Sequence, residues 1–191
     1  MTKARVEAFS DGVIAILITI MVLELKVPHG TDWTALEPVL PVFLTYVLSF
    51  VFLGIYWSNH HHMLHAAERV NGAVLWANLH LLFWLSLTPF VTGWMGENHF
   101  AALPTAVYGM VLLLSAIAYT ILQTTIIRLE GPHSRLARAV QRDWKGKLSM
   151  LLYAIAIPTA FFSPLPASAL YVVVALIWLV PDRRIESTLR R

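Results

Sequence analysis

The sequence has no cysteine and little charge. Because none of the 191 residues is cysteine, disulfide bonds and thiolate metal sites are excluded. Charged residues make up 13% of the chain, against about 25% in an average soluble domain, and 58% of the residues are hydrophobic. The sequence also lacks a Gly-rich phosphate loop and a nucleophile elbow. These features favour an integral membrane protein that forms a single domain over residues 1–191.

Six apolar segments predict an all-α membrane protein with six transmembrane helices. The first covers about 4–26, which is roughly 34 Å of helix and enough to cross a bilayer core of about 30 Å. The others cover about 38–62, 71–95, 102–127, 147–163 and 167–181. Few residues separate the last two segments, so we expect them to form a tight helical hairpin.

The distribution of basic residues predicts the orientation. With a cytoplasmic N-terminus, all of the 14 Lys and Arg residues except Lys26 lie on the inside. This asymmetry follows the positive-inside rule, and an odd number of spans would destroy it. We therefore expect both termini in the cytoplasm and, for an α-helical bundle, the inner (plasma) membrane. The longest inner loop, 128–147, is expected to contact anionic lipid rather than nucleic acid.

Polar residues of three segments are expected at one depth. At 1.5 Å per residue they lie roughly 10 Å from the inner boundary of the membrane. A carboxylate at that depth is costly unless it is paired or hydrogen-bonded. We therefore predict one polar network, which could serve a function or simply hold the helices together. Its members are Arg5, Ser10, Asp11, Trp57, His60, His61 and Asn78.

The first segment separates its polar and apolar faces. At 100° per residue, Asp11 lies roughly 120° from Arg5, so these two residues do not form a pair within the helix. Asp11 and Ser10 must therefore find partners on other helices. One face of the helix carries Arg5, Phe9, Gly12, Ile16, Thr19, Ile20 and Leu23. On its own, an Ile/Leu stripe of this kind is typical of packing or lipid contact.

The histidine cluster WSNHHHMLH leaves two other functions open. His61 and His65 share one helical face and could hold a metal, as in a membrane metal enzyme. Too few further ligands converge on that cluster, so we predict no metal site. Asp11 and the histidines could instead form the proton relay of a proton-coupled membrane carrier. Such carriers usually have inverted repeats, and none is found in the sequence.

Three motifs resemble the transmembrane protein 175 family of potassium channels. Arg5-x-x-x-Phe9-Ser10-Asp11 resembles the RxxxFSD motif of the family in its prokaryotic form. Trp57-x-x-His60-His61 and the stretch that follows Asn78 also resemble the pattern of that family. With six spans and cytoplasmic ends, the resemblance covers essentially the whole chain.

The resemblance implies a channel with weak selectivity for K⁺ over Na⁺, with no enzymatic activity and no cofactor. Prokaryotic members are homotetramers in which the first helices line a central pore, and the TVGYG filter of other potassium channels is absent here. Carried over by position, Ile16 forms a hydrophobic constriction, Ile20 and Leu23 form further apolar layers, and Thr19 forms the selectivity layer. The implied structural network consists of Arg5, Phe9, Ser10, Asp11, Trp57, His60, His61 and Asn78.

Overall fold

The computed structural model describes residues 2–140 and 143–179, and every regular element in these ranges is helical. The elements are α1 (Lys3–Ile20), η1 (Met21–Glu24), η2 (Trp33–Val39), α2 (Leu40–Ala66), α3 (Gly72–Ser86), α4 (Thr88–Glu97), α5 (Ala102–Glu130), α6 (Arg135–Val140), α7 (Trp144–Phe162) and α8 (Pro164–Leu179). Arg142, the C-terminal arginines and the last two residues of the expected sixth span lie outside the described residues.

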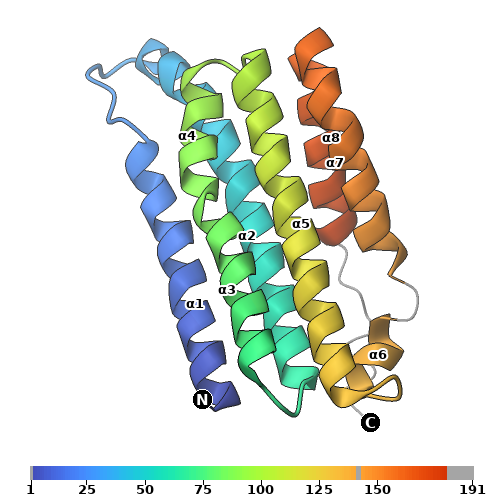
Figure 1. The fold of residues 1–191 in the computed structure, drawn as a ribbon. Coiled ribbons are helices and arrows are strands. Elements are labelled where there is room, and N and C mark those ends of the chain that lie inside the picture. The colour runs from blue at the N-terminus through green and yellow to red at the C-terminus, as the bar shows by residue number, and fades with distance from the viewer. Residues whose placement is uncertain (1, 141–142, 180–191) are drawn as a thin grey trace.

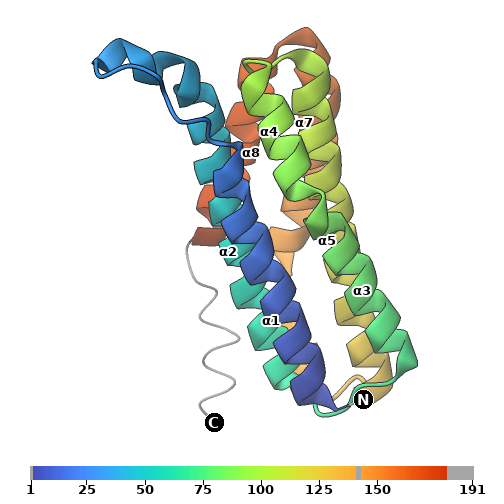
Figure 2. The same ribbon diagram turned by 90° about the vertical axis from the view of Figure 1, so that its left-hand side faces the viewer.

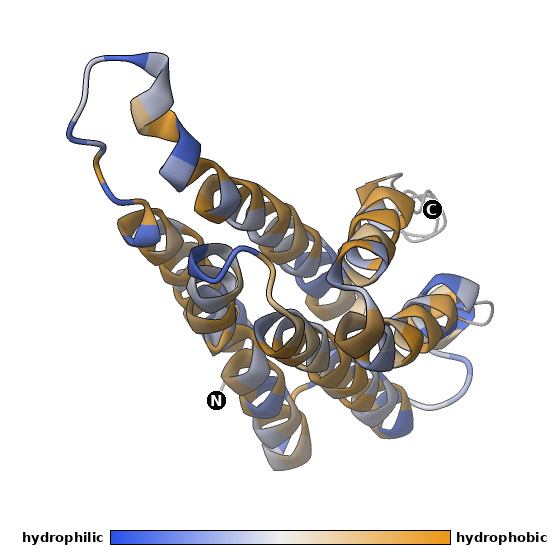
Figure 3. Ribbon diagram, turned by 90° about the horizontal axis from the view of Figure 1, so that it is seen from above, coloured by the Kyte–Doolittle hydropathy of each residue, from blue (hydrophilic) through white to orange (hydrophobic). Residues whose placement is uncertain are grey.

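Four stretches of the described chain are long and apolar enough to cross a membrane. They are Lys3–Glu24, Trp33–Ala66, Gly72–Glu97 and Ala102–Glu130, and α8 is a shorter apolar helix. The helices are largely hydrophobic along their length (Figure 3), and many large apolar side chains are exposed, among them Trp76 and Phe162. Apolar surface on this scale needs lipid or another chain to cover it. These features confirm an all-α membrane protein, while the count of six spans stays a prediction.

The helices stand side by side, with α1 at one edge of the bundle and α7 and α8 at the other (Figure 1). The N-terminus, the turn between α2 and α3, and α6 lie at the same end of the molecule. At the opposite end, the segment that holds η2 leans away from the other helices (Figure 2). This arrangement leaves α1 with neighbours on one side only, namely α2, α3 and α4.

The helix that returns across the bundle after α2 is broken at Leu87. α3 ends at Ser86, α4 begins at Thr88, and Pro89 stands in the first turn of α4. Proline has no N–H to donate to the preceding turn, and its ring clashes with the carbonyl four residues earlier. The break therefore has a local cause, although the apolar sequence runs on without interruption.

Two clusters of buried side chains form the core. The first, which includes Ile14, Leu53 and Leu81, joins α1, α2, α3 and α5. The second, which includes Tyr108 and Tyr171, joins α2, α4, α5, α7 and α8. Because every buried apolar residue of α1 belongs to the first cluster, α1 depends on its contacts with the α2–α3 side of the bundle.

A glycine allows α4 to pack directly against α2. A Cβ atom placed on Gly96 would lie 2.6 Å from Val42 Cα and 2.6 Å from Thr45 Oγ1. Such contacts are far inside van der Waals distance, and one of the two partners is backbone that cannot move alone. By contrast, a Cβ atom on Gly54 in α2 would meet no atom within 4 Å.

We therefore expect Gly96→Ala to destabilise the fold by about 1–3 kcal/mol, the usual cost of overpacking a tight contact. The measurement is the thermal unfolding of the detergent-solubilised protein, followed by tryptophan fluorescence. Gly54→Ala is the matched control, and it should leave the melting temperature unchanged or raise it, because alanine favours helix by about 0.5–1 kcal/mol. Equal melting temperatures for the two variants would contradict the close approach of α2 and α4.

Candidate functional site

α1 has a buried face and an exposed face. The buried residues Val6, Ser10, Ile14, Leu17 and Met21 recur every three or four positions, and they face α2 and α3. The opposite face carries the predicted stripe. Its residues Arg5, Phe9, Gly12, Ile16, Thr19, Ile20 and Leu23 are all exposed in the chain. The side chains of Ile16 and Leu23 are 62% and 76% exposed, so no described element of this chain covers them.

The end of α1 tightens into the 3₁₀ turn η1. Side chains three residues apart lie directly above one another in a 3₁₀ helix, so Leu23 stays in line with Ile20. Thr19 Oγ1 donates within its own helix, at 3.0 Å from the carbonyl oxygens of both Ala15 and Ile16. With its proton held in this way, the hydroxyl oxygen presents its lone pairs to the exposed side, where they can accept a hydrogen bond or coordinate a cation.

Three buried side chains connect α1, α2 and α3. Asn78 Nδ2 donates to Ser10 Oγ at 2.9 Å, and Asn78 Oδ1 lies 2.7 Å from His60 Nε2. An amide oxygen can only accept, so His60 Nε2 is the donor in the second bond. Ser10 and His60 are completely buried, and Asn78 is 2% exposed. Each bond thus satisfies polar groups that water does not reach, and together the two bonds tie three helices to one another.

We call these two hydrogen bonds, Ser10–Asn78 and Asn78–His60, the relay. A second contact between α1 and α2 lies beside it. Trp57 Nε1 donates to Asp11 Oδ1 at 3.1 Å, and the Trp57 ring stacks on His61 with ring centroids 6.4 Å apart. The carboxylate of Asp11 is therefore hydrogen-bonded, as its depth required. We call Ser10, Asp11, Trp57, His60 and Asn78 the polar anchor.

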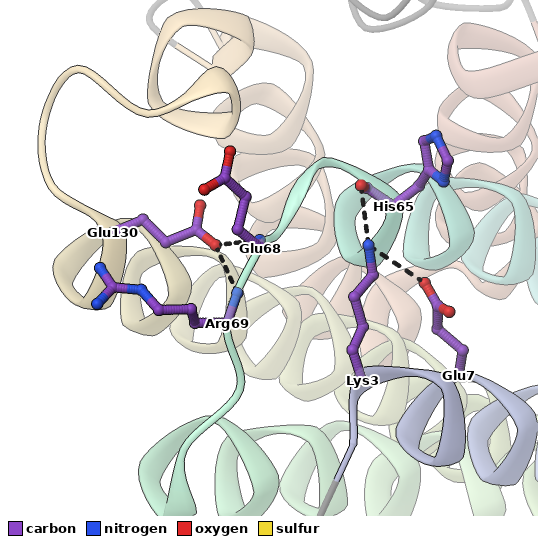
Figure 4. A network of polar contacts seen from close by, with 6 residues as sticks. All are labelled: Lys3, Glu7, His65, Glu68, Arg69 and Glu130. Carbon is purple, nitrogen blue, oxygen red and sulfur yellow. Dashed lines mark hydrogen bonds and ion pairs between the residues drawn. The ribbon is translucent and has the colours of Figure 1, made fainter.

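The α1–α2 contact continues to the end of both helices (Figure 4). Lys3 Nζ donates to the carbonyl oxygen of His65 at 3.0 Å and lies 3.9 Å from Glu7 Oε1. The bonds Asp11–Trp57 and Lys3–His65 join residues eight positions apart on each helix, as expected for two antiparallel helices of equal rise. By this register, Glu7 stands level with His61, between the two bonds.

Comparison with known proteins places these residues in a family. The family model described as "Endosomal/lysosomal potassium channel TMEM175" matches residues 5–89. A potassium channel from Chryseobacterium sp. is 57% identical over 190 residues, which cover 100% of this chain and 99% of the relative. The chain belongs to the TMEM175 family. A potassium channel from Streptomyces collinus is 34% identical over 187 residues, 87% of each chain.

A solved TMEM175 structure has the same fold. The crystal structure of a lysosomal potassium-selective channel TMEM175 homolog from Chamaesiphon minutus matches with a TM-score of 0.78 and 28% sequence identity. The match covers 93% of this chain and 96% of the other chain. The resemblance inferred from the motifs is thus confirmed, and the chain is a multi-pass membrane protein of a potassium channel family. Because the relatives are channels, the membrane carrier and the metal enzyme lose their support.

The TMEM175 motifs coincide with the polar anchor, with three exceptions. Arg5 is exposed and makes no hydrogen bond or ion pair with a described residue, and Phe9 is 50% exposed. His61 is exposed and touches the anchor only through its ring stack on Trp57. Their places in the structural network stay predictions. The contacts of Lys3 and Glu7 were not predicted from the sequence, although the spacing of Lys3, Glu7 and Asp11 by four residues would have placed them on one face.

The turn between α2 and α3 is fastened to α5 by a carboxylate (Figure 4). Glu130 Oε1 accepts from the backbone N–H of Arg69 at 3.2 Å and from that of Glu68. The Arg69 guanidinium in turn donates to the carbonyl of Leu129 at 3.1 Å. These bonds hold the end of α2, and with it the histidine-rich stretch, in a fixed place.

At the opposite end of the molecule, an ion pair joins the loop after η1 to the end of α4. In this pair, Lys26 Nζ lies 2.6 Å from Glu97 Oε1. The hydrogen bond and the negative charge of Glu97 raise the pKa of Lys26 above its ordinary value. Both side chains are accessible to solvent, so salt weakens this pair readily.

Removing the middle of the relay tests the anchor. In Asn78→Ala, the buried N–H of His60 loses its acceptor and Ser10 loses its donor, so we expect the stability to fall by about 1–3 kcal/mol. Thermal unfolding in detergent measures the change. Asn98→Ala is the control, because Asn98 is exposed and its side chain bonds only to the carbonyl of Trp94 among the described residues. A similar melting temperature for both variants would show that the relay contributes nothing to stability.

Proposed function

We propose that this chain assembles as a homotetramer and forms a channel that conducts K⁺ with weak selectivity over Na⁺. In this proposal, the chain crosses the inner (plasma) membrane six times, both termini are cytoplasmic, and the four copies of α1 line a central pore. The channel uses no cofactor, and its partners are the permeant K⁺ ion and membrane lipid. Support comes from the family and from the apolar face of α1 that the described chain leaves exposed.

The position of α1 suits a pore-lining helix. It stands at the edge of the bundle, attached on one side to α2 and α3 (Figure 1). Copies of α1 arranged around an axis would cover each other's flanks and turn the stripe toward the axis. In a closed ring of identical subunits, each flank of α1 is covered by a neighbouring copy and each stripe faces the axis.

In this channel, Ile16 forms the narrowest layer. Four isoleucine side chains around an axis make an apolar ring, in which water is unstable when the pore is narrow. Ile20 and Leu23 extend the apolar lining toward the outer end. A small rotation or outward shift of α1 wets the ring, so the state of the pore depends on how the inner end of α1 is held by the polar anchor.

Thr19 forms the polar layer, about 4.5 Å beyond Ile16 along the helix. Its hydroxyl proton is bonded within the helix, so four oxygen atoms face the axis and can replace part of the hydration shell of K⁺. A single ring of hydroxyls offers far fewer oxygen ligands than successive rings of filter carbonyls. Weak rather than strong selectivity follows from this arrangement.

We expect Ile16→Asn to increase the K⁺ current of reconstituted channels several-fold, because an amide ring holds water in the constriction. The measurement is the current through protein in planar bilayers, normalised to the amount of protein inserted. Ile155→Asn is the matched control, since it places the same change on an exposed face of α7 and should leave the current unaltered. Equal currents in wild type and Ile16→Asn would remove Ile16 from the gate.

We expect Thr19→Val to lower the selectivity for K⁺ while preserving side-chain shape, since valine has no oxygen to offer the ion. The reversal potential under opposed K⁺ and Na⁺ solutions should move toward zero. Thr19→Ser keeps the hydroxyl and should keep the wild-type reversal potential. If valine and serine gave the same value, selectivity would have to arise elsewhere in the pore.

A further inference from the structure

The histidines at the inner end of α2 form an exposed pair that lies outside the proposed pore lining and outside the polar anchor. His61 and His65 are both exposed, and their rings are stacked at 6.0 Å between centroids with 17° between planes. Neither imidazole makes a hydrogen bond to a described residue. His65 takes part in the α1–α2 contact through its backbone carbonyl alone, so its ring nitrogens are available to a ligand.

From the sequence alone we predicted no metal site at this cluster, but the exposed, stacked arrangement of the pair points to a transition metal. Two histidines four residues apart on one helical face have the spacing that binds zinc in the HExxH motif. A metal with bonds of about 2.1 Å to each nitrogen requires nitrogens about 3–4 Å apart. Stacked rings with centroids 6.0 Å apart can reach this distance by rotation about their side-chain bonds, since exposure leaves them room to turn.

The surroundings hold the backbone that carries the pair in place. The His61 ring rests on Trp57, whose indole N–H is bonded to Asp11. The end of α2 that carries His65 is fixed by Lys3 on one side, and its turn is fixed by Glu130 on the other (Figure 4). A rigid backbone beneath two ligands lowers the entropic cost of binding.

A carboxylate on the facing helix lies at the level of the pair. Glu7 stands level with His61 by the register of the two helices, and its partner Lys3 is 3.9 Å away, at the limit of an ion pair. No group of three or more His, Cys, Asp or Glu among residues 2–140 and 143–179 is already arranged around a metal position. The site is thus a two-histidine chelate that Glu7 can complete by a change of rotamer, with water in the other positions.

We propose that His61 and His65 bind a divalent transition-metal cation such as Zn²⁺, Ni²⁺ or Cu²⁺, with Glu7 as the third ligand from α1. Imidazole is a favoured ligand for these metals, and a carboxylate completes a common ligand set. The bound ion joins α1 to α2 at the inner end. If α1 lines the pore, as the proposed function states, the ion restrains the rotation of α1 and lowers the current from the cytoplasmic side.

Binding is tested on the full chain in detergent, with any polyhistidine tag removed. Calorimetric titration with Ni²⁺ and with Zn²⁺ should show one site per chain. His65→Ala, which lies outside the polar anchor, should weaken the affinity at least about tenfold, and His133→Ala in the α5–α6 loop should not. Absence of binding to the wild type, or equal binding to His65→Ala, overturns the proposal.

The ligand set is tested with Cu²⁺. Electron paramagnetic resonance of the Cu²⁺-loaded protein should show two imidazole nitrogens bound in the wild type and one in His65→Ala. Glu7→Gln should weaken Ni²⁺ binding and Glu68→Gln should not. Unchanged affinity in Glu7→Gln overturns the role of Glu7.

The effect on conduction is measured separately. Zn²⁺ added to the cytoplasmic side should reduce the current of the wild type and leave that of His65→Ala unchanged. A protein that binds the metal but passes no current in any condition would contradict the channel and leave the metal site standing. If Zn²⁺ binds but the current does not change, the proposed restraint on α1 is wrong.

Discussion

A polar group that enters a membrane helix must find its hydrogen bonds on a neighbouring helix, because lipid offers none. In this chain that requirement falls on Ser10 and Asp11, near the start of α1. Asn78 on α3 donates to Ser10, and Trp57 on α2 donates to Asp11. His60 in turn donates to the amide oxygen of Asn78. Since α1 touches the bundle on one side only, these bonds fix a helix that apolar packing alone would hold weakly.

The bonds also distribute the attachment of α1 unevenly along its length. Its N-terminal half is held by directional contacts from Lys3 to Asp11. Its C-terminal half is held by the packing of Leu17 and Met21, and it ends in the 3₁₀ turn η1, whose hydrogen-bond geometry is poorer than that of an α-helix. Ile16, Ile20 and Leu23 of the stripe therefore lie in the half of α1 that is held by apolar packing, which is non-directional.

The sequence predicted the partners of the polar anchor as a group but not as pairs. Depth placed Asp11, Trp57 and Asn78 together, because helical rise converts residue number directly into distance. Depth also placed Arg5 in the cluster, whereas its position on the helical wheel leaves it exposed. The Lys3–His65 bond could not be predicted from a residue pattern, because its acceptor is a backbone carbonyl, which every residue has. The break at Leu87 was missed because hydropathy stays high on both sides of Pro89.

The anchor has a second consequence, which concerns the rotation of α1. Isoleucine and leucine occur on every side of this helix, for example at Ile14, Ile16 and Leu17, so several rotations would bury similar apolar areas. Hydrophobic burial is non-directional and distinguishes poorly among them. A hydrogen bond from Asn78 to Ser10 exists at one rotation only, and at that rotation Ile16 points away from the bundle. The buried polar residues therefore determine which apolar residues are left to line the proposed pore, although they lie on the opposite face of the helix.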